Sequence, residues 1–403
     1  MMHINDLLRD PWRAVPVFGV TQILAWGAIY YTPVLMVPRI CADYGWSTAF
    51  AMSGFSLGLL VSGFTAPFIG VWIDRYGGHV VMPFGSLIGA TGLMLIPAAS
   101  NQAAYLAVWA LLGFGMAASF YDPAFASLGR IFGSNARSPI TMLTLIGGLA
   151  STVSWPATQF LIDTIGWQHT YIAYGLALAL VAAPLHAFAL PRSRAYPETV
   201  VAAEPAKPAP APSPRGRNFV LLVAGFALAS FVPSGLLSNL LAMFQRLGLE
   251  PAVAVAIGTL FGPCQVAVRL GEFIFARNTH PLSIVRCAIG FVLFAFVVLF
   301  ALGLSIPVAA VFMILLGLGN GLTTICRGTV PLALFGPRGY GRVIGRIAGP
   351  SLIVQSSAPP IVAFVAEHAS DMAALALTSI FAALSLGCFL AVRRSSESLI
   401  QLR

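Results

Sequence analysis

The stretch GVWIDRYGGH, residues 70–79, separates two long apolar runs at residues 47–73 and 80–99. Each run is long enough to cross a hydrocarbon core of about 30 Å as a helix. An acid followed directly by an arginine, Asp74 and Arg75, with glycines at both ends, permits a sharp turn between two helices and supplies charges that can latch the turn. The stretch therefore predicts a charged hairpin at a membrane surface.

Composition extends this prediction to the whole chain. Of the 403 residues, 58% are hydrophobic and 9% are charged, and the mean hydropathy is +0.87. So little charge cannot solvate the surface of a globular protein of this size. The sequence therefore predicts a polytopic membrane protein embedded in a lipid bilayer.

The basic residues predict its orientation. When successive loops are assigned alternately to two sides of the membrane, most of the 22 Lys and Arg residues fall on one side, and only Arg39 and Arg246 fall on the other. Basic loops remain in the cytoplasm, so both termini are expected there, and the net charge of +9 does not indicate a nucleic-acid partner. The preference for Arg over Lys, 21 to 1, points to a GC-rich bacterial source and hence to the inner membrane.

The apolar runs fall into two sets of six. The first set lies at residues 14–38, 47–73, 80–99, 104–129, 139–162 and 169–190, and the second at residues 218–241, 251–275, 281–303, 306–335, 347–366 and 373–392. The segment between them is rich in Pro and Ala and cannot bury a core. We therefore expect an N-terminal six-helix bundle over residues 1–190, a cytoplasmic linker over 191–217 and a C-terminal six-helix bundle over 218–403.

Three features together resemble the major facilitator superfamily: the G-x-x-x-D-R-x-G-G-H spacing between the second and third spans, the twelve spans and the central linker. The resemblance implies an all-α fold of two pseudo-symmetric six-helix bundles that rock about a midplane site. One departure is His79, which stands where the family usually carries a basic residue near the end of the loop. Because histidine titrates near neutral pH, this departure predicts a weaker or pH-sensitive latch.

Charged residues within the spans are the strongest site signals, because each is costly in lipid unless it faces a cavity or a partner. Asp122 and Arg327 occupy similar places in the fourth and tenth spans, which line the central cavity in the family that the chain resembles. We expect the two to pair, directly or through substrate, when the cytoplasmic side is closed. The alternative is a permanent structural ion pair.

A second set of candidates lies on the eighth span, where Gln265, Arg269 and Glu272 share one helical face. An arginine in this span resembles the arrangement in monocarboxylate and oxalate-type members, where it meets a carboxylate through two parallel hydrogen bonds. The acid expected one turn earlier in the monocarboxylate branch is Gln265 here. Arg269 and Glu272 could instead form a local salt bridge. Carboxylates in low dielectric take up protons readily, so Asp122 and Glu272 are the candidate proton carriers.

Further substrate contacts are predicted on the first, tenth and eleventh spans. Gln22, Trp26 and Tyr30 are spaced by four and form a stripe suited to a planar or partly apolar substrate. Asn320 is a polar candidate in the tenth span, although the glycines around it could instead mark a close helix crossing. Gln355 lies beside helix-breaking prolines in the eleventh span.

These features predict a secondary active transporter, a monomer, that couples a small organic anion to a proton gradient by symport or antiport. No phosphate-binding G-x-x-x-x-G-K-[ST] motif is present, and no catalytic or metal-ligating constellation indicates an enzyme, a metal or a cofactor. The first alternative is an exporter of toxic or amphipathic compounds, which the aromatic stripe favours. The remote alternative is a receptor without transport activity.

Overall fold

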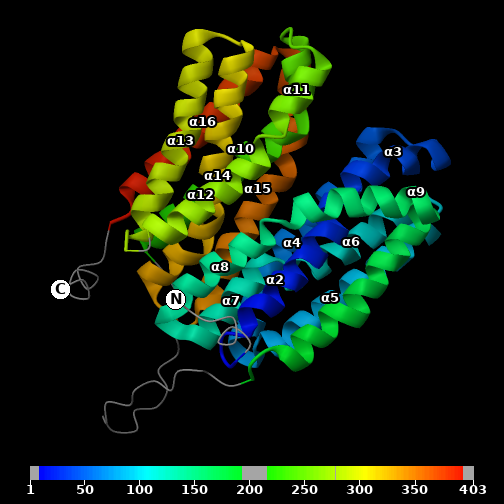
Figure 1. Cartoon of the computed structure of the whole chain (residues 1–403), viewed down its shortest axis with the longest axis vertical. Helices are drawn as coiled ribbons and strands as arrows, with labels where there is room; N and C mark the ends of the chain where they lie inside the picture. Colours follow the sequence, from blue (N-terminus) through cyan, green and yellow to red (C-terminus); the bar gives the residue numbers. More distant parts are fainter. Residues whose placement is uncertain (1–8, 193–215, 277, 394–403) are drawn as a thin grey trace. The chain divides into compact units, whose positions relative to one another are not determined.

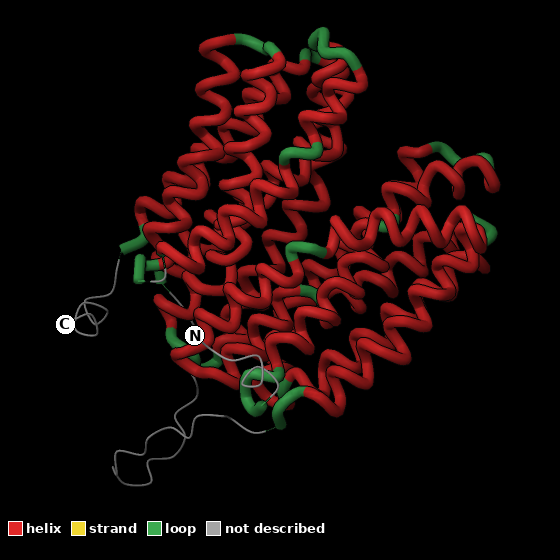
Figure 2. The backbone as a smooth tube through the Cα atoms, viewed as in Figure 1, coloured by secondary structure: helices red, strands yellow, loops and turns green. Residues whose placement is uncertain are grey.

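The structure is a computed structural model that describes residues 9–192, 216–276 and 278–393. These residues form helices joined by short turns and contain no strand (Figure 2). The predicted all-α membrane fold is therefore confirmed.

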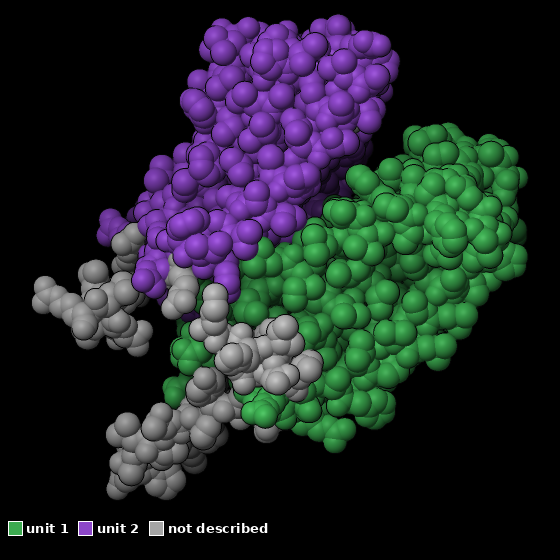
Figure 3. Space-filling view, in the orientation of Figure 1, with its two compact units in different colours: residues 1–213, 336–349 green, residues 214–335, 350–403 purple. Residues whose placement is uncertain are grey.

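Two compact units make up the chain (Figure 3). Unit 1 comprises residues 1–213 and 336–349, and unit 2 comprises residues 214–335 and 350–403. The division assigns the first ten residues of one long helix, α15 (Tyr340–His368), to unit 1 and the rest of that helix to unit 2. The predicted linker lies mostly outside the described residues, so its boundaries stay a prediction.

The α-helices of the first half are interrupted by short π-helical and 3₁₀ segments, and Figure 1 shows their course. In chain order they are α2 (Ala14–Ala25), the π-helix η1 (Trp26–Tyr31), α3 (Pro33–Tyr44), α4 (Thr48–Tyr76), α5 (Gly78–Leu95), the 3₁₀ turn η2 (Ile96–Ala98), α6 (Gln102–Ser119), α7 (Tyr121–Phe132), the 3₁₀ turn η3 (Gly133–Ala136), α8 (Arg137–Gly147), α9 (Ala150–Ala177) and the π-helical segments η4 (Leu178–Ala182) and η5 (Leu185–Ala189).

The second half contains longer uninterrupted helices. They are α10 (Arg217–Arg246), α11 (Pro251–Gly258), α12 (Phe261–Phe275), α13 (Pro281–Leu302), α14 (Ile306–Phe335), α15 (Tyr340–His368) and α16 (Asp371–Ala391).

Ten stretches among the described residues are long and apolar enough to cross a membrane. One of them, Gln102–Ala189, is 88 residues long, whereas a single crossing needs about 20 residues. It covers three of the predicted apolar runs, and Gly166, with φ 78° and ψ 164°, breaks the helical conformation inside α9. The structure therefore accommodates the twelve predicted spans.

Unit 1 uses a buried histidine to join three of its helical segments. His186 on η5 is fully buried, and its two ring nitrogens lie 3.1 Å from Ser86 Oγ on α5 and 2.9 Å from Thr21 Oγ1 on α2. Since a buried polar ring without partners is costly, these two hydroxyls explain how a histidine fits in this apolar interior. The contact has a structural role.

Within unit 2, aromatic packing joins α10 to α16, and one arginine joins α13 to α16. Phe231 stacks on Phe381 with ring centroids 3.9 Å apart, which joins α10 to α16. Arg286 on α13 donates from Nε to the Phe389 carbonyl (3.0 Å) and from Nη2 to the Val392 carbonyl (2.9 Å). These carbonyls lie at the C-terminal end of α16, where the last helical acceptors have no partner in their own helix. Arg286 therefore satisfies the end of a neighbouring helix.

Candidate functional site

The charged hairpin forms where the sequence predicts it. Helix α4 ends at Tyr76, α5 begins at Gly78, and Gly77 between them has φ 86°, a conformation that glycine adopts without strain. Arg75 lies over the ring of Tyr76 at 5.1 Å, and Arg130 of α7 donates to the main-chain carbonyl of Asp74. Asp74 and Arg75 thus engage different partners.

The carboxylate of Asp74 caps the start of α15. Its Oδ1 accepts a hydrogen bond from the backbone N–H of Gly341, and its Oδ2 accepts one from Arg342, both at 2.8 Å. These donors are among the N-terminal amides that a helix cannot satisfy itself, and the helix dipole favours a negative charge there. The residues that Asp74 contacts belong to the segment of α15 within unit 1.

Glycines let α4 and α15 approach each other closely beside Asp74. A Cβ atom built on Gly70 of α4 would overlap the carbonyl oxygen of Gly341, and one built on Gly345 would approach the carbonyl of Ala66. The backbones of α4 and α15 therefore touch directly, and this close approach brings the amides of Gly341 and Arg342 to Asp74.

The predicted stripe on the first span is assembled as an aromatic cluster in unit 1, which we define as Trp26, Tyr30, Tyr31, Phe55, Phe120 and Tyr121. The Trp26 ring stacks on Phe120 with centroids 4.5 Å apart and planes 19° apart. Tyr30 and Tyr121 lie 4.7 and 5.2 Å from the same ring. Trp26, Tyr30 and Tyr121 are partly exposed, so their rings remain accessible.

Gln22 holds the cluster in place. This fully buried side chain donates from Nε2 to the Ser119 carbonyl (2.7 Å) and accepts from Trp26 Nε1 at its Oε1 (3.0 Å). The stripe continues through η1, where the helix widens to π geometry and Thr32 Oγ1 donates to the Gly27 carbonyl at 2.5 Å. Single π-helical turns are frequent at functional sites.

A break in the fourth span supplies the rest of the cluster. Helix α6 ends at Ser119 and α7 begins at Tyr121, because Phe120 between them is extended, with ψ −163°. The break turns Phe120 and Tyr121 toward Trp26 and puts Asp122 in the first turn of α7, where the helix dipole favours an acid. The apolar run at residues 104–129 predicts one continuous span and does not predict this break. Pro123 is the signal, since proline fits best in the first turn of a helix.

Unit 2 contains a polar cluster, which we define as Gln265, Arg269, Glu272 and Asn320. Arg269 and Glu272 on α12 are only 4% and 5% exposed. Arg269 Nη2 and Asn320 Nδ2 both donate to Gln265 Oε1, at 3.2 and 2.9 Å, and Arg269 Nε lies 3.4 Å from the carbonyl of Gly321. The structure thus brings Asn320 of α14 onto the predicted face of α12.

The structure shows the close helix crossing around Asn320, whereas the substrate contact by Asn320 stays a prediction. Cβ atoms on Gly317 and Gly321 would lie 2.8 Å from the carbonyl of Phe261 and 2.6 Å from Val268 Cγ1, so α14 crosses α12 closely. This crossing is what lets the amide of Asn320 reach Gln265. Close helix packing and the polar contact are therefore parts of one arrangement.

The other predicted residues are distributed over both units. Asp122 belongs to unit 1 and Arg327 to unit 2, so their pairing stays a prediction. Arg327 is partly buried on α14. Gln355 on α15 is partly buried, and its carbonyl accepts a hydrogen bond from Ser234 Oγ at 2.8 Å.

Comparison with known proteins identifies the family. The sequence matches the Major Facilitator Superfamily over residues 18–349, most of the chain. The chain belongs to the Major Facilitator Superfamily. It is accordingly a multi-pass membrane transporter and not an enzyme.

Curated relatives narrow the comparison within this superfamily. The chain is 32% identical over 155 residues to human monocarboxylate transporter 11 and 29% identical over 174 residues to rat monocarboxylate transporter 13. These matches cover 38% and 42% of the chain and 31% and 38% of the relatives, so the chain aligns with about a third of their length. The monocarboxylate resemblance predicted from the eighth span is therefore supported at the level of sequence.

Solved structures confirm the superfamily fold. The human organic anion transporter MFSD10 superposes with a TM-score of 0.72 at 16% identity, covering 94% of this chain and all of that one. The transporter FucP in its outward conformation gives a TM-score of 0.71 at 13% identity, covering 94% and 99%. At these identities the likeness concerns the fold alone.

Proposed function

We propose that this transporter carries a small organic carboxylate and couples its movement to protons by alternating access. The observation that carries the proposal is the buried guanidinium of Arg269, held by Gln265 within the polar cluster of unit 2. A buried cation in a membrane protein is costly, so it is expected to serve a function.

The geometry of arginine suits a carboxylate. A guanidinium presents N–H donors in a planar fork that matches two carboxylate oxygens, and such charge-assisted bonds are roughly twice as strong as neutral ones. Gln265 accepts a hydrogen bond from Nη2 of Arg269 and so fixes one side of the guanidinium. The amide of Asn320 supplies a further donor in the same cluster. We assign substrate binding to Arg269, Gln265 and Asn320, with Arg327 and Gln355 as further contacts in unit 2.

The aromatic cluster contributes the apolar part of the binding surface. Gln22, Trp26 and Tyr30 would contact the carbon skeleton of the substrate, since ring faces offer a large apolar area with defined orientation. The human and rat sequence relatives are both named monocarboxylate transporters. Those names support an anionic substrate for this chain.

Proton coupling is assigned to Asp122 and Glu272, and gating to Asp74 and Arg75. Asp74 is suited to gating because its carboxylate caps α15, a helix that continues into unit 2. We further propose that the protein acts as a monomer in a bacterial inner membrane with both termini in the cytoplasm.

The test is uptake of labelled monocarboxylates into proteoliposomes, with and without an imposed pH gradient. We expect uptake that rises with the gradient, collapses with a protonophore and is lost in Arg269→Gln but retained in Arg217→Gln, which removes an exposed arginine at the start of α10. Uptake that is independent of Arg269 would contradict the proposal, as would transport of lipophilic cations alone.

A second candidate is efflux of amphipathic compounds, which the partly exposed rings of the aromatic cluster favour. Rings of this kind can hold flat, lipophilic cations. In that case Trp26→Leu would abolish export of such cations, while Arg269→Gln would leave it intact.

A further inference from the structure

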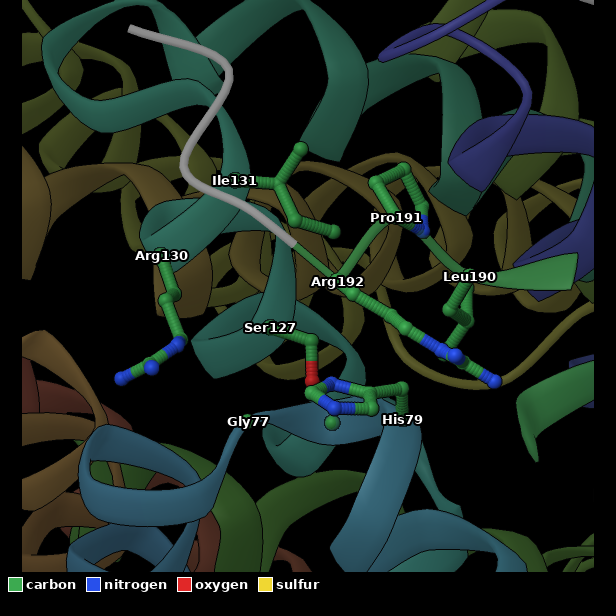
Figure 4. A pocket seen from close by; sticks show the side chains of 9 residues that line it. Gly77, His79, Ser127, Arg130, Ile131, Leu190, Pro191 and Arg192 are labelled. Carbon is green, nitrogen blue, oxygen red and sulfur yellow. The ribbon is translucent and has the colours of Figure 1, made fainter. Parts of the chain in front are cut away.

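A small pocket lies beside the charged hairpin in unit 1, and none of its lining residues belongs to the aromatic cluster or the polar cluster (Figure 4). Three segments line it: the start of α5 at Gly77, Gly78 and His79, the end of α7 at Ser127, Arg130 and Ile131, and the chain that follows η5 at Leu190, Pro191 and Arg192. None of the residues to which we assign substrate binding, proton coupling or gating lines this pocket.

The charged and titratable lining is exclusively basic. Among the nine lining residues, His79, Arg130 and Arg192 carry basic groups, and none is acidic. Both arginines lie within electrostatic range of the His79 ring, and Figure 4 shows them on either side of it. Arg130 is anchored by its bond to the Asp74 carbonyl, whereas Arg192 is exposed at the rim. Like charges gathered in one pocket repel one another, and an anion between them would relieve that repulsion.

The backbone adds to this positive potential. Gly78 is the first residue of α5, and Gly77, Gly78 and His79 all line the pocket. The N-terminal end of α5, which carries the positive end of the helix dipole, therefore lies at the pocket. A Cβ atom on Gly78 would overlap Ser127 Oγ, so this glycine lets the amide end of α5 lie directly against α7.

Exposed aromatic side chains indicate the depth of the pocket in the bilayer. Trp72 and Tyr76, at the end of α4 next to the pocket, are 49% and 47% exposed. Tryptophan and tyrosine gather at the level of lipid headgroups, and arginine favours the same depth. The Arg75 guanidinium over the Tyr76 ring fits this placement. From these neighbouring side chains we infer that the pocket lies at the depth of the lipid headgroups.

We propose that this basic pocket binds a phosphate group, with Arg192 and His79 as its principal contacts. Two sources share this chemistry: the headgroup of an acidic phospholipid and a free phosphate ion. Basic pockets between transmembrane helices are suited to such headgroups. The proposal does not depend on the substrate proposed above.

The experiment measures binding to the purified full-length protein in detergent by native mass spectrometry. Three ligands are titrated: short-chain phosphatidylglycerol, short-chain phosphatidylcholine and inorganic phosphate. The variants are Arg192→Gln and, as a matched control, Arg217→Gln, which also removes one exposed arginine but lies outside the pocket.

We expect phosphatidylglycerol to bind more tightly than phosphatidylcholine, and Arg192→Gln to weaken that binding by about fivefold, the effect of one basic residue at an anionic surface. Arg217→Gln should change it by less than about twofold. If inorganic phosphate also binds in a manner that depends on Arg192 and competes with the lipid, the pocket accepts free phosphate as well as the headgroup. If inorganic phosphate does not bind in this way, the ligand of the pocket is the lipid headgroup. Equal losses in the two variants for every ligand, or no loss in either, would overturn the proposal.

Discussion

The first span of unit 1 and the eighth span of unit 2 each carry a predicted stripe of side chains, but the two stripes offer different chemistry. In unit 1, Gln22 is fully buried and orients a set of partly exposed rings. In unit 2, a glutamine again lies one turn from the key side chain, but Gln265 orients the charged Arg269 instead of an indole. In the proposed function, the rings of unit 1 contact the apolar body of a substrate and the arginine of unit 2 contacts its carboxylate.

The largest expected effect comes from removing that charge. Arg269→Gln should weaken carboxylate binding by roughly 10- to 150-fold, because hydrogen bonds to charged groups contribute about 1.5–3 kcal/mol. Titration of the purified protein by isothermal calorimetry measures the change, with Arg217→Gln as the exposed control. An unchanged dissociation constant would mean that the charge of unit 2 has a structural role only.

The second prediction concerns the hydrogen bonds by which Gln22 orients the Trp26 ring in unit 1. Gln22→Leu removes the partner of the Ser119 carbonyl and of Trp26 Nε1, and leaving buried polar groups without partners should lower the free energy of unfolding by about 1–3 kcal/mol. Chemical unfolding in detergent, followed by tryptophan fluorescence, measures the change. Gln159→Leu is the matched control, because Gln159 makes only an exposed bond to Asp163. Equal losses in the two variants would show that Gln22 does not organise the cluster.

A smaller effect is expected at the hairpin. Asp74→Ala removes a carboxylate that caps α15 through two backbone amides, and losses of helix caps cost about 0.5–2 kcal/mol. Thermal unfolding should show a lower midpoint than Asp163→Ala, in which an exposed acid is removed. If the unfolding midpoint is unchanged while transport slows, the cap serves gating more than stability.

The smallest effect concerns an exposed ion pair in unit 2. Arg246 and Asp371 join α10 to α16 through two bonds of 3.0 and 2.6 Å. The hydrogen bond from Asp371 raises the pKa of Arg246, so the guanidinium stays charged over the pH range of any transport assay. Because the arginine is 51% exposed, Arg246→Gln should cost at most about 1 kcal/mol, and less in high salt. A larger, salt-independent loss of unfolding free energy would show that the pair is more shielded from solvent than its exposure indicates.

Local periodicity explains which parts of these sites the sequence could predict. Gln22, Trp26 and Tyr30, and likewise Gln265 and Arg269, are spaced by four residues, and a helix places such residues on one face whatever surrounds it. Apolar runs of about 20 residues likewise predicted the spans, and the glycines of the hairpin predicted its turn.

Partners distant in the sequence could not be predicted in this way. The amides that bind Asp74 lie 267 and 268 residues away, and their position depends on the close packing of glycine backbones between α4 and α15. Phe120 joins the aromatic cluster only because the fourth span breaks before it. These contacts follow from packing, which the periodicity of a single span does not specify.

We propose that Arg269 recognises a carboxylate. The direct test removes the charge of the ligand, the charge of the arginine, or both, and measures binding in each case. Calorimetry would compare a binding monocarboxylate with its uncharged carboxamide analogue, each titrated into the unmodified protein and into Arg269→Gln. We expect the unmodified protein to bind the carboxylate at least tenfold more tightly than the amide, and this preference to disappear in Arg269→Gln. A preference of equal size in both proteins would show that the carboxylate is recognised at another site.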